Sequence, residues 1–190
     1  VHELVIEITA KANSEIAKKI KDSPKLKGMG TTLTSLITTE DKVALIHIGD
    51  SRCYQFRAGK LTQLSKDHTL VQELLDQGRL SPEEANSHPQ KSLITKALMG
   101  NPETEPFIQL INVEPDDLFL LCTDGLSSVI NESEISKILR EDGVTEIAAE
   151  KLKSAVYKSG APDNITLVLA KLTNEKLNVV GILGAAAVVA

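Results

Sequence analysis

Most β-strand patterns in this sequence are joined by connections too short to contain a helix. Four strand patterns follow one another in the first third of the chain, the first of them rich in β-branched residues: residues 31–39, 42–50, 52–57 and 61–64. The turn pair Glu40-Asp41 separates the first two runs, and Ala58-Gly59-Lys60 separates the last two. Parallel strands need a crossover of about a dozen residues or more, so these connections predict antiparallel sheets.

Helix patterns lie before, between and after these strands. Two capping boxes, Ser81 with Glu84 and Asn131 with Glu134, mark helix starts. Periodicity predicts helices over 1–22, 69–78, 132–141 and 144–160, and further strands over 105–113, 117–123 and 164–172. This order favours an α+β domain, with antiparallel sheets flanked by helices, over a wound βαβ sheet.

The first predicted helix carries an apolar stripe at steps of four residues. The stripe consists of Leu4, Ile8, Ala12, Ile16 and Ile20. Residues at this spacing share one helix face, so we expect the stripe to pack against the core.

Composition excludes some classes of function. A net charge of −5 gives no basic surface for nucleic acid, so we expect no nucleic-acid partner. The two cysteines, Cys53 and Cys122, both lie inside predicted strands. Buried, reduced cysteines suit a cytoplasmic domain better than a secreted one.

The last residues, VVGILGAAAVVA at 179–190, are uniformly apolar. They are too few to cross a bilayer, which takes about 20 residues, but the run continues to the last residue and Lys171 and Lys176 precede it. We therefore expect a folded domain over 1–172, a juxtamembrane linker over 173–178 and the start of a transmembrane helix over 179–190, which would anchor the cytoplasmic domain to the membrane. A buried C-terminal helix is the alternative.

Three aspartates lie at the ends of predicted strands, at chain reversals: Asp50 in HIGDSR, Asp124 in CTDGL and Asp163 in APDNIT. Carboxylates held at strand ends suit a hard cation such as Mg²⁺ or Mn²⁺. Aspartate is also a common turn residue, so local pattern alone leaves both interpretations open. For Asp124 a helix-cap role is weakened, because Asn131 with Glu134 already opens the following helix.

The order of four motifs adds a resemblance to a known family. The motifs are GMGTTL at 28–33, the segment 47–100 that begins HIGDSR, DLFLLCTDGL at 117–126 and SGAPDNITL at 159–167. Together they resemble the metal-dependent serine/threonine protein phosphatases of the PP2C type, especially bacterial members, from about Gly28 to Leu172. The resemblance implies a sandwich of two antiparallel sheets with helices on both outer faces.

The resemblance also implies roles for individual residues. Asp124 and Asp163 match ligands of the family's dinuclear Mg²⁺ or Mn²⁺ centre, and Asp50 matches a third, weaker metal position. The segment Val71 to His88 resembles the flap beside the active site. His88 lies at the end of the flap, where it either approaches the substrate or serves as a surface or hinge residue.

The implied activity is hydrolysis of phosphoserine and phosphothreonine in proteins by a water activated at the metal centre. The family's early phosphate-binding arginine, its NED-like motif and its DGMGGH motif with the bridging aspartate have no counterpart in these 190 residues. We therefore expect the chain to begin inside the helix after those motifs and to have little activity alone. A non-catalytic phosphatase-like signalling or binding module is the main alternative, and a structural domain with aspartate turns is a weaker one.

Overall fold

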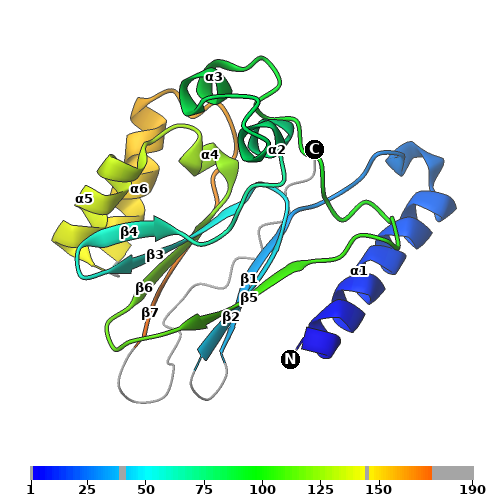
Figure 1. The fold of residues 1–190 in the computed structure, drawn as a ribbon, viewed down its shortest axis with the longest axis horizontal. Coiled ribbons are helices and arrows are strands. Elements are labelled where there is room, and N and C mark those ends of the chain that lie inside the picture. Colours follow the sequence, from blue (N-terminus) through cyan, green and yellow to red (C-terminus); the bar gives the residue numbers. More distant parts are fainter. Residues whose placement is uncertain (1, 39–41, 144–145, 173–190) are drawn as a thin grey trace.

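The computed structural model describes residues 2–38, 42–143 and 146–172 (Figure 1). Its helices are α1 (His2–Asp22), the 3₁₀ helix η1 (Pro24–Leu26), α2 (Leu70–Asp76), α3 (Pro82–Ser87), α4 (Asp124–Ser127), α5 (Glu132–Asp142) and α6 (Glu146–Lys158). Its strands are β1 (Leu33–Thr38), β2 (Lys42–Ile48), β3 (Arg52–Arg57), β4 (Lys60–Gln63), β5 (Phe107–Asn112), β6 (Leu118–Cys122) and β7 (Leu167–Lys171). Each helix and strand predicted for the folded domain over 1–172 is therefore present within the described ranges.

The strands form two antiparallel sheets, one in the order β1-β2-β5 and the other in the order β4-β3-β6-β7. Figure 1 shows α5 and α6 on the outer side of the four-stranded sheet and α1 on the outer side of the other. The predicted fold class, two antiparallel sheets with helices on both outer faces, is confirmed. Two short connections, at residues 49–51 and 113–117, carry the chain from one sheet to the other instead of forming hairpins.

Two groups of buried side chains account for the layers. Between the sheets lie Leu45, Cys53, Ile111 and Phe119. Outside the four-stranded sheet, its strands pack on α4, α5 and α6 through Tyr54, Leu118, Leu120, Cys122, Leu126, Ile130, Ile135, Leu139, Ala148, Leu152, Val156 and Leu169. Because strand side chains alternate between the two faces of a sheet, neighbouring residues in β3 and β6 belong to different groups. Both cysteines are free and buried, as expected.

Local start and stop signals predicted several boundaries correctly. The Ser81 side chain accepts from the Glu84 amide while the Glu84 carboxylate accepts from the Ser81 amide, which completes the first capping box. At the second predicted capping box the Asn131 side chain accepts from the Glu134 amide. A bond from the Asn131 amide to the Glu134 carboxylate is not present among the described contacts. Gly78 and Gly160 have positive φ where α2 and α6 end.

The prediction for the first helix is wrong about which face is buried. α1 buries Val5, Thr9 and Asn13, whereas Leu4 and Ile8 are 58% and 56% exposed. The cause is a polar contact, because the Asn13 side chain accepts from the Gly100 amide at 2.6 Å and donates to the Asn101 carbonyl. This contact faces Asn13 inward, so Leu4, Ile8 and Ala12, each one residue before a buried position, face outward. The rest of the stripe, Ile16 and Ile20, is half-buried.

Some predictions fall outside the described residues. The Glu40-Asp41 turn, the linker 173–178 and the apolar run 179–190 belong to them, so the membrane anchor stays a prediction. Among the helices of the described ranges, none combines the length and the apolar character that crossing a membrane requires.

Candidate metal centre

The three predicted aspartates lie at the same end of the four-stranded sheet. In the strand register Arg52 pairs with Cys122, and Cys122 pairs with Leu167. The segments that carry Asp50, Asp124 and Asp163 extend beyond this row of paired residues: before β3, after β6 and before β7. The order of strands β3, β6 and β7 therefore brings to one end of the sheet carboxylates that are far apart in the chain, the first at residue 50 and the last at residue 163.

The backbone before Asp50 is held by close packing, and the backbone after it is held by hydrogen bonds. Before it, Gly49 has a φ of 109°, and a Cβ there would lie 2.3 Å from the Thr32 side chain. After it, the Ser51 hydroxyl pairs with the Thr32 hydroxyl at 2.9 Å, and the Ser51 carbonyl accepts from the Thr34 hydroxyl at 2.9 Å. Asp50 therefore extends from a rigid turn where the chain crosses between the sheets.

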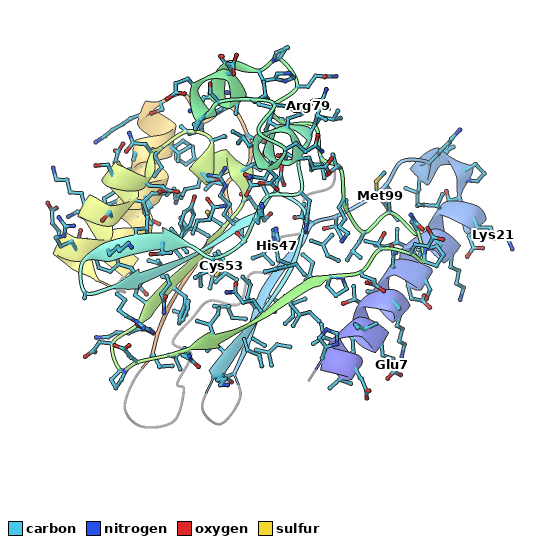
Figure 2. The ribbon with its side chains drawn as sticks, in the orientation of Figure 1. Glu7, Lys21, His47, Cys53, Arg79 and Met99 are labelled. Carbon is cyan, nitrogen blue, oxygen red and sulfur yellow. The ribbon has the colours of Figure 1, made fainter. Side chains whose placement is uncertain are left out.

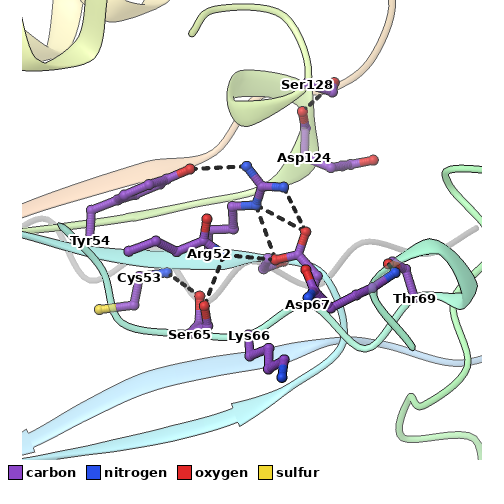
Figure 3. Close-up of polar contacts among 12 residues, drawn as sticks. Arg52, Cys53, Tyr54, Ser65, Lys66, Asp67, Thr69, Asp124 and Ser128 are labelled. Atoms are coloured by element: carbon purple, nitrogen blue, oxygen red, sulfur yellow. Dashed lines mark hydrogen bonds and ion pairs between the residues drawn. The ribbon is translucent and has the colours of Figure 1, made fainter. Parts of the chain in front are cut away.

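Asp124 is the first residue of α4 and does not act as a helix cap. The residue before it, Thr123, is the N-cap, and α5 has its own cap in Asn131. The Asp124 carbonyl accepts from the Ser128 amide and hydroxyl (Figure 3), and the Asp124 carboxylate accepts from the backbone amides of Gly125 and Asp124 itself. The structure thus agrees with the argument against the cap.

The loop that carries Asp163 is attached to the end of β6. The Thr123 amide donates to the Thr166 carbonyl at 3.0 Å, and the Thr166 amide donates to the Thr123 hydroxyl at 3.1 Å. Asp163 itself is exposed and accepts from the Asn164 amide at 2.7 Å. These bonds fix the positions of Asp124 and Asp163 relative to each other.

Burial and neighbouring carboxylates together raise the pKa values of Asp50 and Asp124. Burial and, next to it, the Asp124 charge raise the pKa of Asp50 to about 6. Burial and then the Asp163 charge raise the pKa of Asp124 above its ordinary value. Carboxylates that repel one another in this way form a region of uncompensated negative charge, which favours a bound cation.

An ion pair that the sequence analysis did not identify lies beside this region. Arg52 donates from Nε and Nη2 to the Asp67 carboxylate, at 3.0 and 2.7 Å, and from Nη1 to the Tyr54 hydroxyl at 3.2 Å. Figure 3 shows the guanidinium between those two groups, with Asp124 nearby. The Asp67 charge adds to the repulsion on Asp50 and Asp124, and the Arg52 charge opposes that repulsion at Asp50. In the sequence, the position of Arg52 two residues after Asp50 was the feature that could have indicated this ion pair.

His88 is the C-cap of α3, and its Nδ1 accepts from the Gln90 amide at 3.1 Å. Within the described part of the chain no hydrogen bond or ion pair joins it to any of the three aspartates. The predicted flap consists of α2, α3 and their connection. The structure therefore brings the aspartates together and leaves His88 in a local turn.

The donor chemistry of the site fits a hard divalent cation, since carboxylate oxygens are the ligands that Mg²⁺ and Mn²⁺ prefer. Among the described residues, however, no three acidic, histidine or cysteine side chains are close enough to form a ready-made metal site. Asp50, Asp124 and Asp163 can thus supply part of a coordination shell.

Comparison with known proteins identifies the family of the chain. The family model described as protein phosphatase 2C matches residues 2–156. The serine/threonine protein phosphatase PstP of Mycobacterium tuberculosis is 45% identical over 162 residues, which are 85% of this chain and 31% of that protein. The protein phosphatase PhpP of Streptococcus pneumoniae is 40% identical over 78% of this chain and 61% of its own length. The chain thus spans about a third and about three fifths of these relatives.

Solved structures match as well. The Mycobacterium tuberculosis phosphatase PstP superposes with a TM-score of 0.81 at 45% identity, covering 85% of this chain and 68% of that one. The serine/threonine phosphatase Stp1 of Staphylococcus aureus gives a TM-score of 0.85 at 27% identity, covering 92% of this chain and 68% of that one. A structure of the PstP catalytic domain in complex with 2 manganese ions gives 0.75 at 42% identity, covering 83% and 65%. Sequence and fold agree, and the chain belongs to the protein phosphatase 2C family.

Proposed function

We propose that this chain forms part of the catalytic domain of a metal-dependent phosphatase that acts on phosphoserine and phosphothreonine in proteins. The observation that carries the proposal is the convergence of Asp50, Asp124 and Asp163 at one end of the four-stranded sheet. Relatives that match most of this chain are named serine/threonine phosphatases, which supports phosphorylated proteins as substrates.

In this proposal Asp124 and Asp163 hold Mg²⁺ or Mn²⁺ at a dinuclear centre, and Asp50 contributes to a third, weaker position. When bound, the cations would supply Lewis acidity that activates water and neutralises charge on the phosphate. The chain's own contribution is positioning. The bonds between Thr123 and Thr166 hold two of the carboxylates in place, and the Arg52–Asp67 pair limits the negative charge beside them.

The raised pKa values of Asp50 and Asp124 support a cation-binding role for these residues. Two carboxylates that repel each other destabilise the folded chain, and a bound dication removes that repulsion. The free energy of this repulsion, which is released when the metal binds, adds to the metal affinity, as in other sites where ligand deprotonation and metal binding are linked. We propose His88 as a substrate contact in the flap, through the imidazole nitrogen that its local turn does not use.

The 190-residue chain alone should bind the metal weakly and turn over slowly, because its described residues include no group of three ligands. The test is hydrolysis of p-nitrophenyl phosphate and of a phosphothreonine peptide with Mn²⁺, by this chain and by the complete product of its gene. Asp124→Asn in the complete product should lower turnover by at least about 100-fold, since metal-ligand loss removes the centre.

Asp116→Asn is the matched control. Asp116 is an exposed aspartate that pairs with Lys171, and its positive φ of 70° suits asparagine. This variant should retain full activity. Failure of the complete product to hydrolyse either substrate would overturn the proposal. Metal-dependent phosphopeptide binding without hydrolysis would instead support the non-catalytic module.

A further inference from the structure

Two histidines that the proposed function does not use are stacked inside the molecule. His47 on β2 is fully buried, and its ring lies 4.9 Å from that of His68, at an angle of 19°. Figure 2 shows His47 in the interior between the sheets, far from Glu7 and Lys21 on α1. The His47 Nε2 lies 3.0 Å from the Lys66 carbonyl, which can only accept, so this nitrogen carries a proton.

His68 lies where the flap leaves the sandwich. We call residues 66–69 and 93–95 the flap root, because the chain enters the flap at the first segment and returns at the second. Three contacts close this root: the Leu70 amide donates to the Leu93 carbonyl, the Thr95 amide donates to the His68 carbonyl, and Thr69 forms a β-bridge with Ile94. His68 is therefore part of the base from which α2 and α3 project.

His68 and Gly49 exchange two hydrogen bonds. The His68 amide donates to the Gly49 carbonyl at 2.8 Å, and the Gly49 amide donates to the His68 Nδ1 at 3.0 Å. A backbone N–H can only donate, so Nδ1 must present its lone pair. The imidazole is therefore neutral, with its proton on Nε2. Burial and the neighbouring His47 favour the same state, because they lower the pKa of His68 to about 4.

Gly49 immediately precedes Asp50 and is held from two directions. Its φ of 109° and its close approach to Thr32 fix one side of its peptide, and His68 fixes the other. Since Ser51 is bonded to Thr32 and Thr34, the carboxylate of Asp50 is aimed by contacts on both flanks. Of these contacts, the one at Gly49 comes from the flap root, where Asp67 also binds Arg52, two residues after Asp50.

We propose that His68 is a positioning residue: the lone pair on its Nδ1 holds the Gly49 amide and fixes the Asp50 carboxylate relative to the flap root. The role rests on the proposed function, in which Asp50 is a metal ligand. It implies that the flap and the third metal position are mechanically linked, so that a displacement of the flap root changes the direction of Asp50. Metal-ligating carboxylates depend on such surrounding contacts for their orientation.

The substitutions that separate this role from simple packing concern Nδ1. His68→Asn places an amide oxygen where Nδ1 lies and should keep the bond from Gly49. His68→Gln places its amide group near the Nε2 position, and His68→Leu has no acceptor. All three should fold, because the Arg52–Asp67 pair and the backbone bond from His68 to Gly49 still attach the flap root to the sandwich. His2→Leu, at an exposed residue of α1, is the control for loss of a histidine.

Mn²⁺ titration of the chain is the first measurement. His68→Leu and His68→Gln should weaken the low-affinity Mn²⁺ site about tenfold, the size found when a contact supporting a metal ligand is removed. His68→Asn and His2→Leu should bind as the unsubstituted chain does. Equal affinity in all four variants, with intact folding by circular dichroism, would overturn the proposal.

A second measurement does not depend on metal. Nitrogen NMR of His68 at neutral pH should show an unprotonated Nδ1, and the Gly49 amide should exchange about tenfold faster in His68→Leu but not in His68→Asn. A proton on Nδ1, or unchanged Gly49 exchange, would overturn the positioning role. If the unsubstituted chain and the complete gene product both bind no Mn²⁺, the proposed function fails, and the NMR result alone decides whether His68 holds Gly49.

Discussion

Gly125 lies directly against the backbone of Asn164. A Cβ at residue 125 would be 2.1 Å from the Asn164 carbonyl oxygen, a separation that no side-chain rearrangement can relieve because the obstacle is backbone. Gly125 follows Asp124 and Asn164 follows Asp163 in the sequence. This close approach therefore joins the two segments that carry the candidate metal ligands.

Gly125→Ala should push these segments apart. We expect Mn²⁺ affinity to fall about tenfold, since the ligands lose their relative position, and the free energy of unfolding to fall by about 1–3 kcal/mol from overpacking. Calorimetric Mn²⁺ titration and urea unfolding measure the two effects. Gly143→Ala is the control: its positive φ of 63° should cost about 1–2 kcal/mol, but its Cβ meets no atom within 4 Å. A loss of Mn²⁺ affinity in the control would contradict this explanation.

The stability of the metal-free chain should depend on pH through Asp50. Its pKa is about 6 in the folded chain against an ordinary 3.8, because burial and then Asp124 disfavour its charged form. Between these pH values the folded chain holds more protons than the unfolded chain, so the free energy of unfolding falls as pH rises. Asp50→Asn should remove this contribution and raise the melting temperature at pH 7 more than at pH 4.

Thermal unfolding of both chains at pH 4, 5, 6 and 7 without metal checks this prediction. The difference in melting temperature between Asp50→Asn and the unsubstituted chain should increase with pH across the window. Saturating Mn²⁺ should stabilise the unsubstituted chain at pH 7 and much less at pH 5, where protons compete for the carboxylate. A difference that does not change with pH would show that Asp50 ionises normally.

The positions of the aspartates could be predicted from the sequence, but their convergence could not. Each follows or precedes a clear strand pattern, and strand patterns are local. The order β4-β3-β6-β7 depends on pairings between strands far apart in the chain, which periodicity does not specify. The family resemblance supplied that information. His68 and Gly125 were missed for the same reason, since each acts through a backbone group 19 or more residues away.

The error in α1 has a different cause. Leu4 and Ile8 form a better apolar stripe than Val5, Thr9 and Asn13, so periodicity favoured the wrong face. The Asn13 side chain is directed inward by backbone groups 87 and 88 residues away in the sequence. A hydrophobic pattern contains no information about such a polar partner.

The carboxylate of Asp117 should be the most important buried charge in the described part of the fold. Its side chain is fully buried and accepts from Arg57 Nε at 2.6 Å, from Gln55 at 3.0 Å and from the Glu114 amide at 2.9 Å. Burial alone would raise the pKa of Asp117, but the bonds from Arg57 and the Glu114 amide outweigh it and hold the pKa below its ordinary value.

Asp117→Asn should therefore lower the free energy of unfolding by about 2–4 kcal/mol at pH 7, because it leaves Arg57 without its buried partner. The loss should shrink in acid. The lowered pKa of Asp117 means that its charge stabilises the fold at pH values above the pKa of the unfolded chain, and this stabilisation disappears as pH falls through the pKa of the folded chain. Urea unfolding at pH 7 and pH 3 measures both effects. Glu114→Gln removes the exposed partner of the same arginine and should cost less than about 1 kcal/mol.

Asn13 should couple α1 to the segment that follows the flap. It is buried, it accepts from the Gly100 amide, and it donates to the Asn101 carbonyl. Gly100 is also fixed by contact, because its φ is 86° and a Cβ there would lie 2.9 Å from Ala17. Asn13→Leu would leave two backbone groups without partners in a buried position and should cost about 2–6 kcal/mol, twice the usual penalty for one such group.

The matched control is Ser14→Ala, which removes only an exposed bond to the Lys11 carbonyl on the same helix and should change stability by less than about 0.5 kcal/mol. Hydrogen exchange distinguishes a local effect from global destabilisation. In Asn13→Leu the Gly100 amide should lose protection against exchange. The amides of β3 and β6 should keep the protection expected from the global free energy of unfolding of the variant. Uniform loss of protection across both sheets would show that Asn13 stabilises the whole fold instead of the junction between α1 and the flap.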